Sequence, residues 1–142
     1  MDYAEDVFSL NFARPAANGA AAPSRAIYCV YGLKDQELIL LYIGRAEMPF
    51  DRFEAHLNQG KLREIRQKGW SIIFTVADVG GYSSGQVDQI EAALVFKHQP
   101  LLNTRHKDSF DYPGTSVGIR GVTPLLNRRF TVGKRLPLRT AA

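Results

Sequence analysis

The sequence has little cysteine, no long apolar run and no recognisable export signal. Its 142 residues include one cysteine, Cys29, which excludes an intramolecular disulfide and a zinc site built on several thiolates. No segment approaches the roughly 20 consecutive apolar residues that a membrane-spanning helix needs. The acidic start MDYAEDVF lacks the basic and apolar regions of a secretory signal. These absences favour a cytoplasmic protein that works without a membrane.

The composition supports one packed domain with an uneven distribution of charge. Hydrophobic residues make up 45% of the chain and aromatic residues 11%, so a core can form. The net charge is +4, but residues 1–104 carry ten lysines and arginines against twelve acids, whereas residues 105–142 carry eight against two. A basic tail on a nearly neutral body is typical of proteins that approach phosphate. A solvated tail without a ligand explains the charge equally well.

Changes in composition divide the chain into three parts. Residues 1–25 form an N-terminal lead-in, in which the alternating residues 7–12 are compatible with a short strand docked on the domain edge. Residues 26–104 carry the periodicity of a folded domain. Residues 105–142, with scattered glycine and proline, predict an irregular extension with at most one hairpin.

The central part predicts a hairpin, a third strand and several helical segments. The expected elements are strands over residues 27–31, 38–44 and 70–77, a helix opened by Pro49, a helical piece over residues 61–68, and a helix from Ser83 or Ser84 to about His98.

Two tyrosines occupy the predicted hairpin. Tyr28 ends the tripeptide Ala-Ile-Tyr, and Tyr42 begins the tripeptide Tyr-Ile-Gly. On adjacent antiparallel strands their side chains are expected to be neighbours. Cross-strand aromatic pairing within a sheet is the ordinary explanation of such a pair.

Charged residues at helical spacing follow the hairpin. Arg52 and His56 are four residues apart, so on a helix they stand one turn apart, beside the apolar Phe50, Phe53 and Leu57. An exposed arginine and histidine on a surface helix is the ordinary alternative.

Glu91 stands within the apolar stripe of the last predicted helix. At about 100° per residue it falls among Val87, Ile90 and Leu94, which face the core. A carboxylate buried among apolar side chains is costly unless a cation or strong donors satisfy it. Glu91 is therefore expected to hold a metal ion or, as a structural alternative, to pair with Arg52.

These residues, taken in chain order with Arg45 and the sequence Pro-Leu-Leu-Asn at residues 100–103, resemble the signature of the GIY-YIG nuclease superfamily. The resemblance covers residues 26–104, with Ala26 where the first glycine of the signature is expected. It implies an α+β fold with a small three-stranded antiparallel sheet flanked by helices, followed by the irregular basic extension. It also implies that Asn103 closes the core beside the tyrosines and that Arg45 lies near the scissile phosphate.

Phosphodiester hydrolysis needs an activated water, charge neutralisation at the phosphate and help for the leaving oxygen. One well-placed carboxylate points to a single hard cation, Mg²⁺ with Mn²⁺ as a substitute, held by Glu91. Arg52 would bind the phosphate, and Tyr28 would accept a proton from water or orient it. An isolated tyrosine ionises near about pH 10, so His56 or Arg45 would have to assist, His56 also by accepting the proton. The predicted catalytic residues are Tyr28, Tyr42, Arg52, His56, Glu91 and Asn103, and the predicted substrate-binding residues are Arg45, Arg52, Arg105, Lys107, Arg128 and Arg129.

The sequence thus predicts a divalent-metal-dependent endonuclease that hydrolyses phosphodiester bonds in DNA. Two alternatives stay open: a catalytically weak nucleic-acid-binding module, which Ala26 favours, and a nuclease toxin or mobile-element protein with the same chemistry. Because no zinc finger, helix-turn-helix or OB signature is present, recognition would rest on DNA structure, a homodimer or a partner protein. Truncation after about residue 108 is expected to weaken DNA binding and lower its salt dependence while leaving the site in place.

Overall fold

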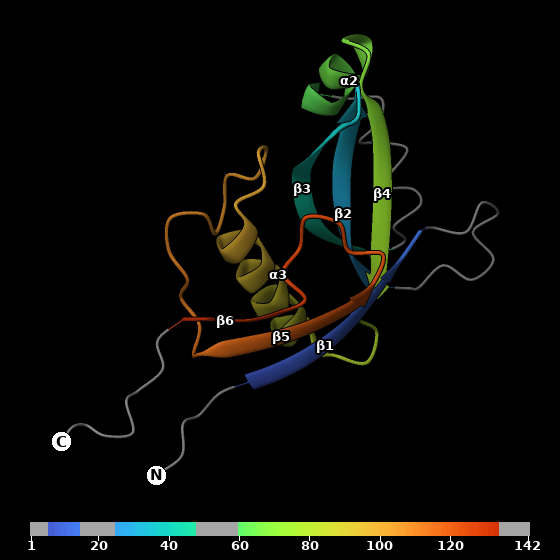
Figure 1. The fold of residues 1–142 in the computed structure, drawn as a ribbon. Coiled ribbons are helices and arrows are strands. Elements are labelled where there is room, and N and C mark those ends of the chain that lie inside the picture. Colours follow the sequence, from blue (N-terminus) through green and yellow to red (C-terminus); the bar gives the residue numbers. More distant parts are fainter. Residues whose placement is uncertain (1–5, 15–24, 48–59, 134–142) are drawn as a thin grey trace.

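The part of the chain that the computed structural model describes comprises residues 6–14, 25–47 and 60–133 (Figure 1). Its elements are β1 (Asp6–Ala13), β2 (Arg25–Lys34), β3 (Glu37–Glu47), α2 (Gly60–Gln67), β4 (Ser71–Asp78), α3 (Ser84–His98), β5 (Thr115–Gly121) and β6 (Arg129–Val132). These strands form one sheet in the order β3-β2-β4-β1-β5-β6. β1 runs parallel to β5, and the other neighbours are antiparallel. Neither helix in these ranges has the length and apolar character to cross a membrane.

β2 and β3 form the predicted hairpin. Asp35 and Gln36 connect the strands, and their φ angles of 51° and 68° are those of a tight two-residue hairpin turn. β3 pairs with one edge of β2 and β4 with the other, and β2 is buried along most of its length. This double pairing explains why the apolar run of β2 shows no polar alternation.

The prediction of a three-stranded sheet is wrong, because the sheet continues past β4. β1 pairs with β4 through Phe12 opposite Ala77, and then runs parallel to β5 along its length. Phe8, Leu10 and Phe12 are buried and the residues between them are exposed, as expected for a strand with one covered face. The lead-in therefore contributes a strand to the interior of the sheet and not to its edge.

The prediction of an irregular extension after residue 105 is also wrong, although the one hairpin that it allowed for is present as β5 and β6. β5 and β6 form an antiparallel pair in which Val117 lies opposite Phe130, and both residues are buried. Two glycines of this region, Gly121 and Gly133, lie at the ends of strands and have positive φ angles. Gly121 closes β5 with φ 93°, and a Cβ there would lie 2.0 Å from the Phe12 carbonyl oxygen.

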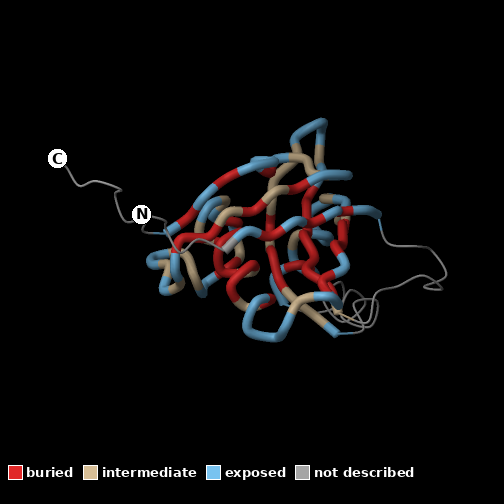
Figure 2. Tube along the Cα trace, turned by 90° about the horizontal axis from the view of Figure 1, so that it is seen from below, coloured by how far each residue is buried: buried red, intermediate tan, exposed pale blue. Residues whose placement is uncertain are grey.

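Two apolar clusters cover the two faces of the sheet. One includes Ile27 and Cys29 and packs with α3, β1, β5 and β6, and the other includes Tyr28, Leu41 and Leu62 and packs with α2. Figure 1 shows the sheet curling, with β1 and β5 crossing the upright strands β2, β3 and β4 at a steep angle and α3 on the enclosed side. Figure 2 shows buried residues concentrated in the middle of the molecule and exposed residues in the connecting loops.

α3 is fixed at both ends. The Ser83 side chain accepts a hydrogen bond from the Gln86 N–H, and the Gln86 side chain accepts one from the Ser83 N–H, which is a capping box. The helix ends at Gln99 in the left-handed conformation. The backbone N–H groups of residues 101 and 102 then donate to two carbonyl oxygens of β3 at 3.2 and 2.7 Å, so the exit of α3 covers part of the free edge of β3.

Truncation after residue 108 is therefore expected to unfold the chain instead of trimming an independent tail. It would remove β5 and β6 and delete buried side chains such as Val117 and Phe130. Removing one large apolar side chain from a core costs about 2–5 kcal/mol, against a domain stability of about 5–15 kcal/mol. Thermal unfolding followed by circular dichroism should lose its cooperative transition. Truncation after Gly133 keeps every described strand and is the control; a native-like transition in the shorter chain would contradict the prediction.

Candidate active site

Tyr28 and Tyr42 lie side by side on the face of the sheet that α2 covers. Their ring centroids are 6.0 Å apart and their planes are inclined by 39°. Gly44, opposite Tyr28 on β3, provides the space for them. A Cβ at Gly44 would be 2.8 Å from the Tyr28 Oη atom and 2.6 Å from the Tyr42 Cε2 atom. A side chain at this position would displace both rings, so the glycine of the Tyr-Ile-Gly tripeptide has a steric role.

Asn103 clamps the exit of α3 to β3 at the tyrosine site. Its side-chain oxygen accepts a hydrogen bond from the Ile43 N–H at 2.9 Å, and its side-chain amide donates to the Ile43 carbonyl oxygen at 2.8 Å. Both hydrogen bonds are buried. Because Ile43 lies between Tyr42 and Gly44, the clamp holds the backbone against which the Tyr28 hydroxyl rests.

Arg45 connects the end of β3 to the start of α3. Side chains alternate along a strand, so Arg45 lies on the opposite face from Gly44. Its guanidinium forms an ion pair with Asp88 and donates to the carbonyl oxygen of Ser84 at 3.4 Å and to the Ser84 hydroxyl at 3.3 Å. The guanidinium is thus engaged by α3.

Glu91 lies on α3 one turn after Asp88 and is partly buried. Burial raises the pKa of Glu91 above its usual value of 4.5, the guanidinium groups of Arg45 and Arg105 act in the opposite direction, and Asp88 adds to the increase. The net direction is upward, so desolvation outweighs the two arginines. A carboxylate in this state is stabilised strongly by an additional cation.

The predicted residues in the described part form two groups that meet at the end of β3. The tyrosines lie on the side of α2, whereas Arg45 and Glu91 lie on the side of α3. The two groups are joined through the backbone, since Gly44 and Arg45 are consecutive. Arg52 and His56 lie outside the described residues.

Of the remaining predicted substrate-binding residues, only Arg105, in the segment after α3, acts electrostatically on Glu91. The others lie away from Glu91 in their contacts. Lys107 donates to the Pro100 carbonyl oxygen at 2.7 Å and so closes the loop after α3. Arg128 donates to a backbone carbonyl at the end of β5 at 3.0 Å, and Arg129 is exposed on β6. β6 is at the other end of the strand order from β3.

Asp88 is the residue of this site that sequence reasoning missed. It pairs with Arg45, and its carboxylate acts on the pKa values of both Glu91 and His106. Its position three residues before Glu91 on a helix was the available signal. The pKa of His106 is lowered, first by burial and then by Arg105, so this imidazole favours its neutral form at the same cluster.

Glu91 and Asp88 are the two acidic side chains of the site, and Asp88 is paired with Arg45. Within residues 6–14, 25–47 and 60–133, no three histidine, cysteine, aspartate or glutamate side chains group as metal ligands. Mg²⁺ keeps several waters and is often bound through one or two carboxylates together with substrate phosphates. The partly buried Glu91 carboxylate, with its raised pKa, is compatible with that mode of binding.

Comparison with known proteins found no relative of this chain. No protein-family model, no curated protein and no solved structure matches the chain. The resemblance to the GIY-YIG superfamily stays a prediction from the motifs, and the function has to be argued from the residues of this chain.

We expect Asn103→Ala to lower the free energy of unfolding substantially. The substitution leaves the buried N–H and C=O groups of Ile43 without their partners, at a cost of about 1–3 kcal/mol for each. Asn103→Asp is the matched control: it keeps an acceptor for the N–H group but sets a second acceptor against the C=O group, so it should also destabilise the fold. Urea denaturation measures both variants. Losses below about 1 kcal/mol in both would show that the clamp is dispensable.

Proposed function

We propose that this chain is a divalent-metal-dependent endonuclease of the GIY-YIG type that hydrolyses phosphodiester bonds in DNA. The observation that carries the proposal is Glu91, a partly buried carboxylate under the electrostatic influence of Arg45 and Arg105, on the helix whose exit is clamped to β3 by Asn103. A carboxylate that serves mainly as an ion-pair partner has a lowered pKa. The opposite shift at Glu91 favours a carboxylate that is kept for a ligand.

The surroundings of Glu91 favour an anionic substrate. Two guanidinium groups, those of Arg45 and Arg105, act on this carboxylate. Guanidinium groups bind phosphate oxygens through paired, charge-assisted hydrogen bonds. The surface ion pair between Arg45 and Asp88 is of low value in water, so a phosphate can replace Asp88 as the partner of Arg45 at little cost.

Glu91 would hold Mg²⁺ or Mn²⁺, and charge neutralisation at the phosphate is the chemistry that the bound cation supplies. Arg45 would bind a phosphate oxygen after exchanging its contact with Asp88. Arg52 retains its predicted part in phosphate binding. Together these cationic groups would stabilise the charge that develops on the phosphate during hydrolysis.

Tyr28 would accept a proton from the attacking water or orient that water. Its hydroxyl packs against Gly44, and the Tyr42 ring lies beside it. A proton acceptor has to lie within hydrogen-bond reach of its water. Because Tyr28 is buried on the α2 side of the sheet and Glu91 lies on the α3 side, this role requires the water to meet the Tyr28 hydroxyl past Gly44, at the edge of β3. His56 retains its predicted part as helper or alternative acceptor.

A nucleic-acid-binding module with little catalysis is the second candidate. It is favoured by the contacts of Arg45 with Asp88 and Ser84, which keep the guanidinium occupied. A panel of single-stranded, duplex, nicked and branched DNA, with RNA, distinguishes the two candidates when Mg²⁺ or Mn²⁺ is supplied. Binding without cleavage of any member would favour the module.

We expect Glu91→Gln to abolish divalent-dependent DNA cleavage and to leave DNA binding largely intact. The amide has nearly the shape of the carboxylate but lacks the charge that holds a cation. Nicking of a supercoiled plasmid measures cleavage, and a gel-shift assay without divalent ions measures binding. Glu37→Gln, which removes an exposed carboxylate at the start of β3, is the control and should cleave like the wild type. Wild-type cleavage by Glu91→Gln would mean that the site is misassigned.

The same variant shows whether burial of Glu91 costs stability. A carboxyl group whose folded-state pKa is raised destabilises the fold when it is ionised, so the cost is absent below about pH 4.5 and grows as the pH rises through the raised value. At pH 7 without metal, the unfolding free energy of Glu91→Gln should equal or exceed that of the wild type, and the difference should vanish on acidification. A variant clearly less stable at pH 7 would indicate a structural ion pair.

Tyr28→Phe tests the mechanism. It removes one hydroxyl and preserves the ring, so stability should change by about 1 kcal/mol. The single-turnover cleavage rate should fall by roughly 10²-fold or more, the scale for loss of a positioned acid–base group. Tyr31→Phe, on the opposite face of the same strand, is the matched control and should keep the rate. If Tyr28→Phe keeps both the rate and its pH profile, Tyr28 is a packing residue and the acceptor is His56 or Tyr42.

A further inference from the structure

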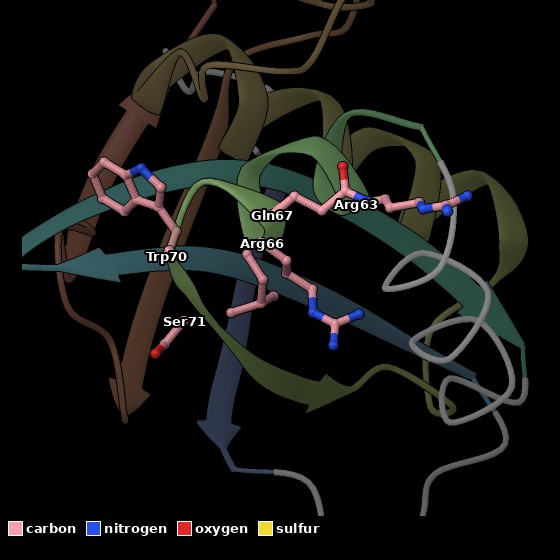
Figure 3. Close-up of a pocket in the computed structure, with 7 residues that line it drawn as sticks. Arg63, Arg66, Gln67, Trp70 and Ser71 are labelled. Atoms are coloured by element: carbon pink, nitrogen blue, oxygen red, sulfur yellow. The ribbon is translucent and has the colours of Figure 1, made fainter.

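A hollow lies where α2 meets β4. Its volume is about 660 Å³, within the range of about 300–1,000 Å³ of small-molecule sites. It is termed the α2 pocket, and Arg63, Arg66, Gln67, Trp70, Ser71 and Ile72 line it. Figure 3 shows the guanidinium groups of Arg63 and Arg66 extending to one side and the Trp70 indole to the other.

The α2 pocket is cationic. Among the described residues that line it, Arg63 and Arg66 are the charged ones, and both are basic. The one acid of α2, Glu64, has its carboxylate 3.8 Å from the Lys61 ammonium. Gln67 adds a neutral amide. Two guanidinium groups with neutral donors are the side chains that recognise a phosphate group.

Trp70 supplies an aromatic surface that packing holds in place. Its Cε3 atom would be 3.2 Å from a Cβ at Gly32, so the indole rests on the glycine of β2. The backbone N–H of Trp70 donates to the Ile65 carbonyl oxygen at 3.3 Å, and this hydrogen bond fixes the turn between α2 and β4. The side chain remains partly exposed. A held, partly exposed indole offers a face on which a nucleobase can stack.

The α2 pocket and the tyrosine site share one face of the sheet. The space beside Gly32 is bounded by Leu41, which belongs to the same apolar cluster as Tyr28. Tyr28 and Gly32 are four positions apart on β2, which is about 13 Å at roughly 3.3 Å per residue. A nucleic-acid strand held at the pocket would therefore lie on the face of the sheet that contains the tyrosines, and its path to Glu91 would run over the edge of β3 at Gly44 and Arg45.

We propose that the α2 pocket binds one nucleotide of an unpaired nucleic-acid strand, with its phosphate on Arg63 and Arg66 and its base against Trp70. In a duplex each base is already stacked between its neighbours, whereas an unpaired base has a free face for an aromatic side chain. The consequence for activity rests on the proposed nuclease function: single-stranded segments, and not continuous duplex, are the substrate class.

The fluorescence of Trp70 reports on this pocket directly, because Trp70 is the only tryptophan in the chain. The full chain is titrated with oligothymidylate in a chelator, so that no hydrolysis takes place. Saturable quenching is expected, with none from an abasic oligomer of the same length and much weaker binding of thymidine monophosphate. Equal quenching by the abasic oligomer, or a duplex or mononucleotide that binds as tightly as the single strand, would overturn the proposal.

Two charge variants test the phosphate contact. Arg63→Gln and Arg66→Gln should each weaken binding of a labelled oligothymidylate and lower the slope of log K against log salt by about 0.7 for each lost phosphate contact. Lys61→Gln removes the same charge from the same helix outside the pocket lining and is the matched control. If all three variants weaken binding equally, the arginines act only through general charge and the pocket is rejected.

Trp70→Leu should weaken binding roughly 5- to 140-fold, the scale for loss of one stacked base, and Trp70→Phe should recover part of that loss. Fluorescence anisotropy of the labelled oligonucleotide measures both. If Trp70→Leu does not fold, the arginine variants and the quenching titration decide. Cleavage that depends on Glu91 without any Trp70 quenching would refute the pocket alone, and quenching without cleavage by any substrate would refute the nuclease alone.

Discussion

Pairing of β2 on both of its edges is the constraint on which the rest of the molecule depends. β3 lies along one edge and β4 along the other for nearly the whole strand. A strand in this position faces two cores, and its side chains alternate between them: Ile27 and Cys29 toward α3, Tyr28 and Val30 toward α2. Tyr28 is buried for this reason, since neighbouring strands pair with its backbone on both edges and its hydroxyl packs against Gly44.

The end of β3 is where structure and proposed chemistry meet. Asn103 holds Ile43 through two buried hydrogen bonds, and the next residues present a glycine to Tyr28 and a guanidinium to α3. The two acidic residues there differ in their contribution to stability. Half of the Asp88 side chain is exposed, so its pairing with Arg45 contributes little stability. Glu91, by contrast, is desolvated to an extent that two arginines do not offset. A bound phosphate would give Arg45 a stronger partner than Asp88, and a bound cation would offset the desolvation of Glu91.

Local patterns were sufficient to predict most individual elements. The hairpin, β4 and α3 lie where apolar runs and capping residues predicted them, and Glu91 is partly buried on α3, as its place in a helical period predicted. The alternation of residues 7–12 indicated a strand. It carried no information about partners, and β1 joins the two halves of the sheet by pairing with both β4 and β5.

For residues 27–98 the sequence by itself determined most of the segments that extend or coil and which of their side chains share a face, because both follow from a period of a few residues; it did not do so for β5 and β6. Only the tertiary structure decided that the sheet has six strands, since Phe8 pairs with Val117 across almost the whole chain. The same holds for the site. The pairing of Arg45 with Asp88, the clamp of Asn103 on Ile43 and the packing of Trp70 over Gly32 join residues that are far apart in sequence. Such contacts depend on how the strands are ordered and how the sheet curls, and no local periodicity encodes either.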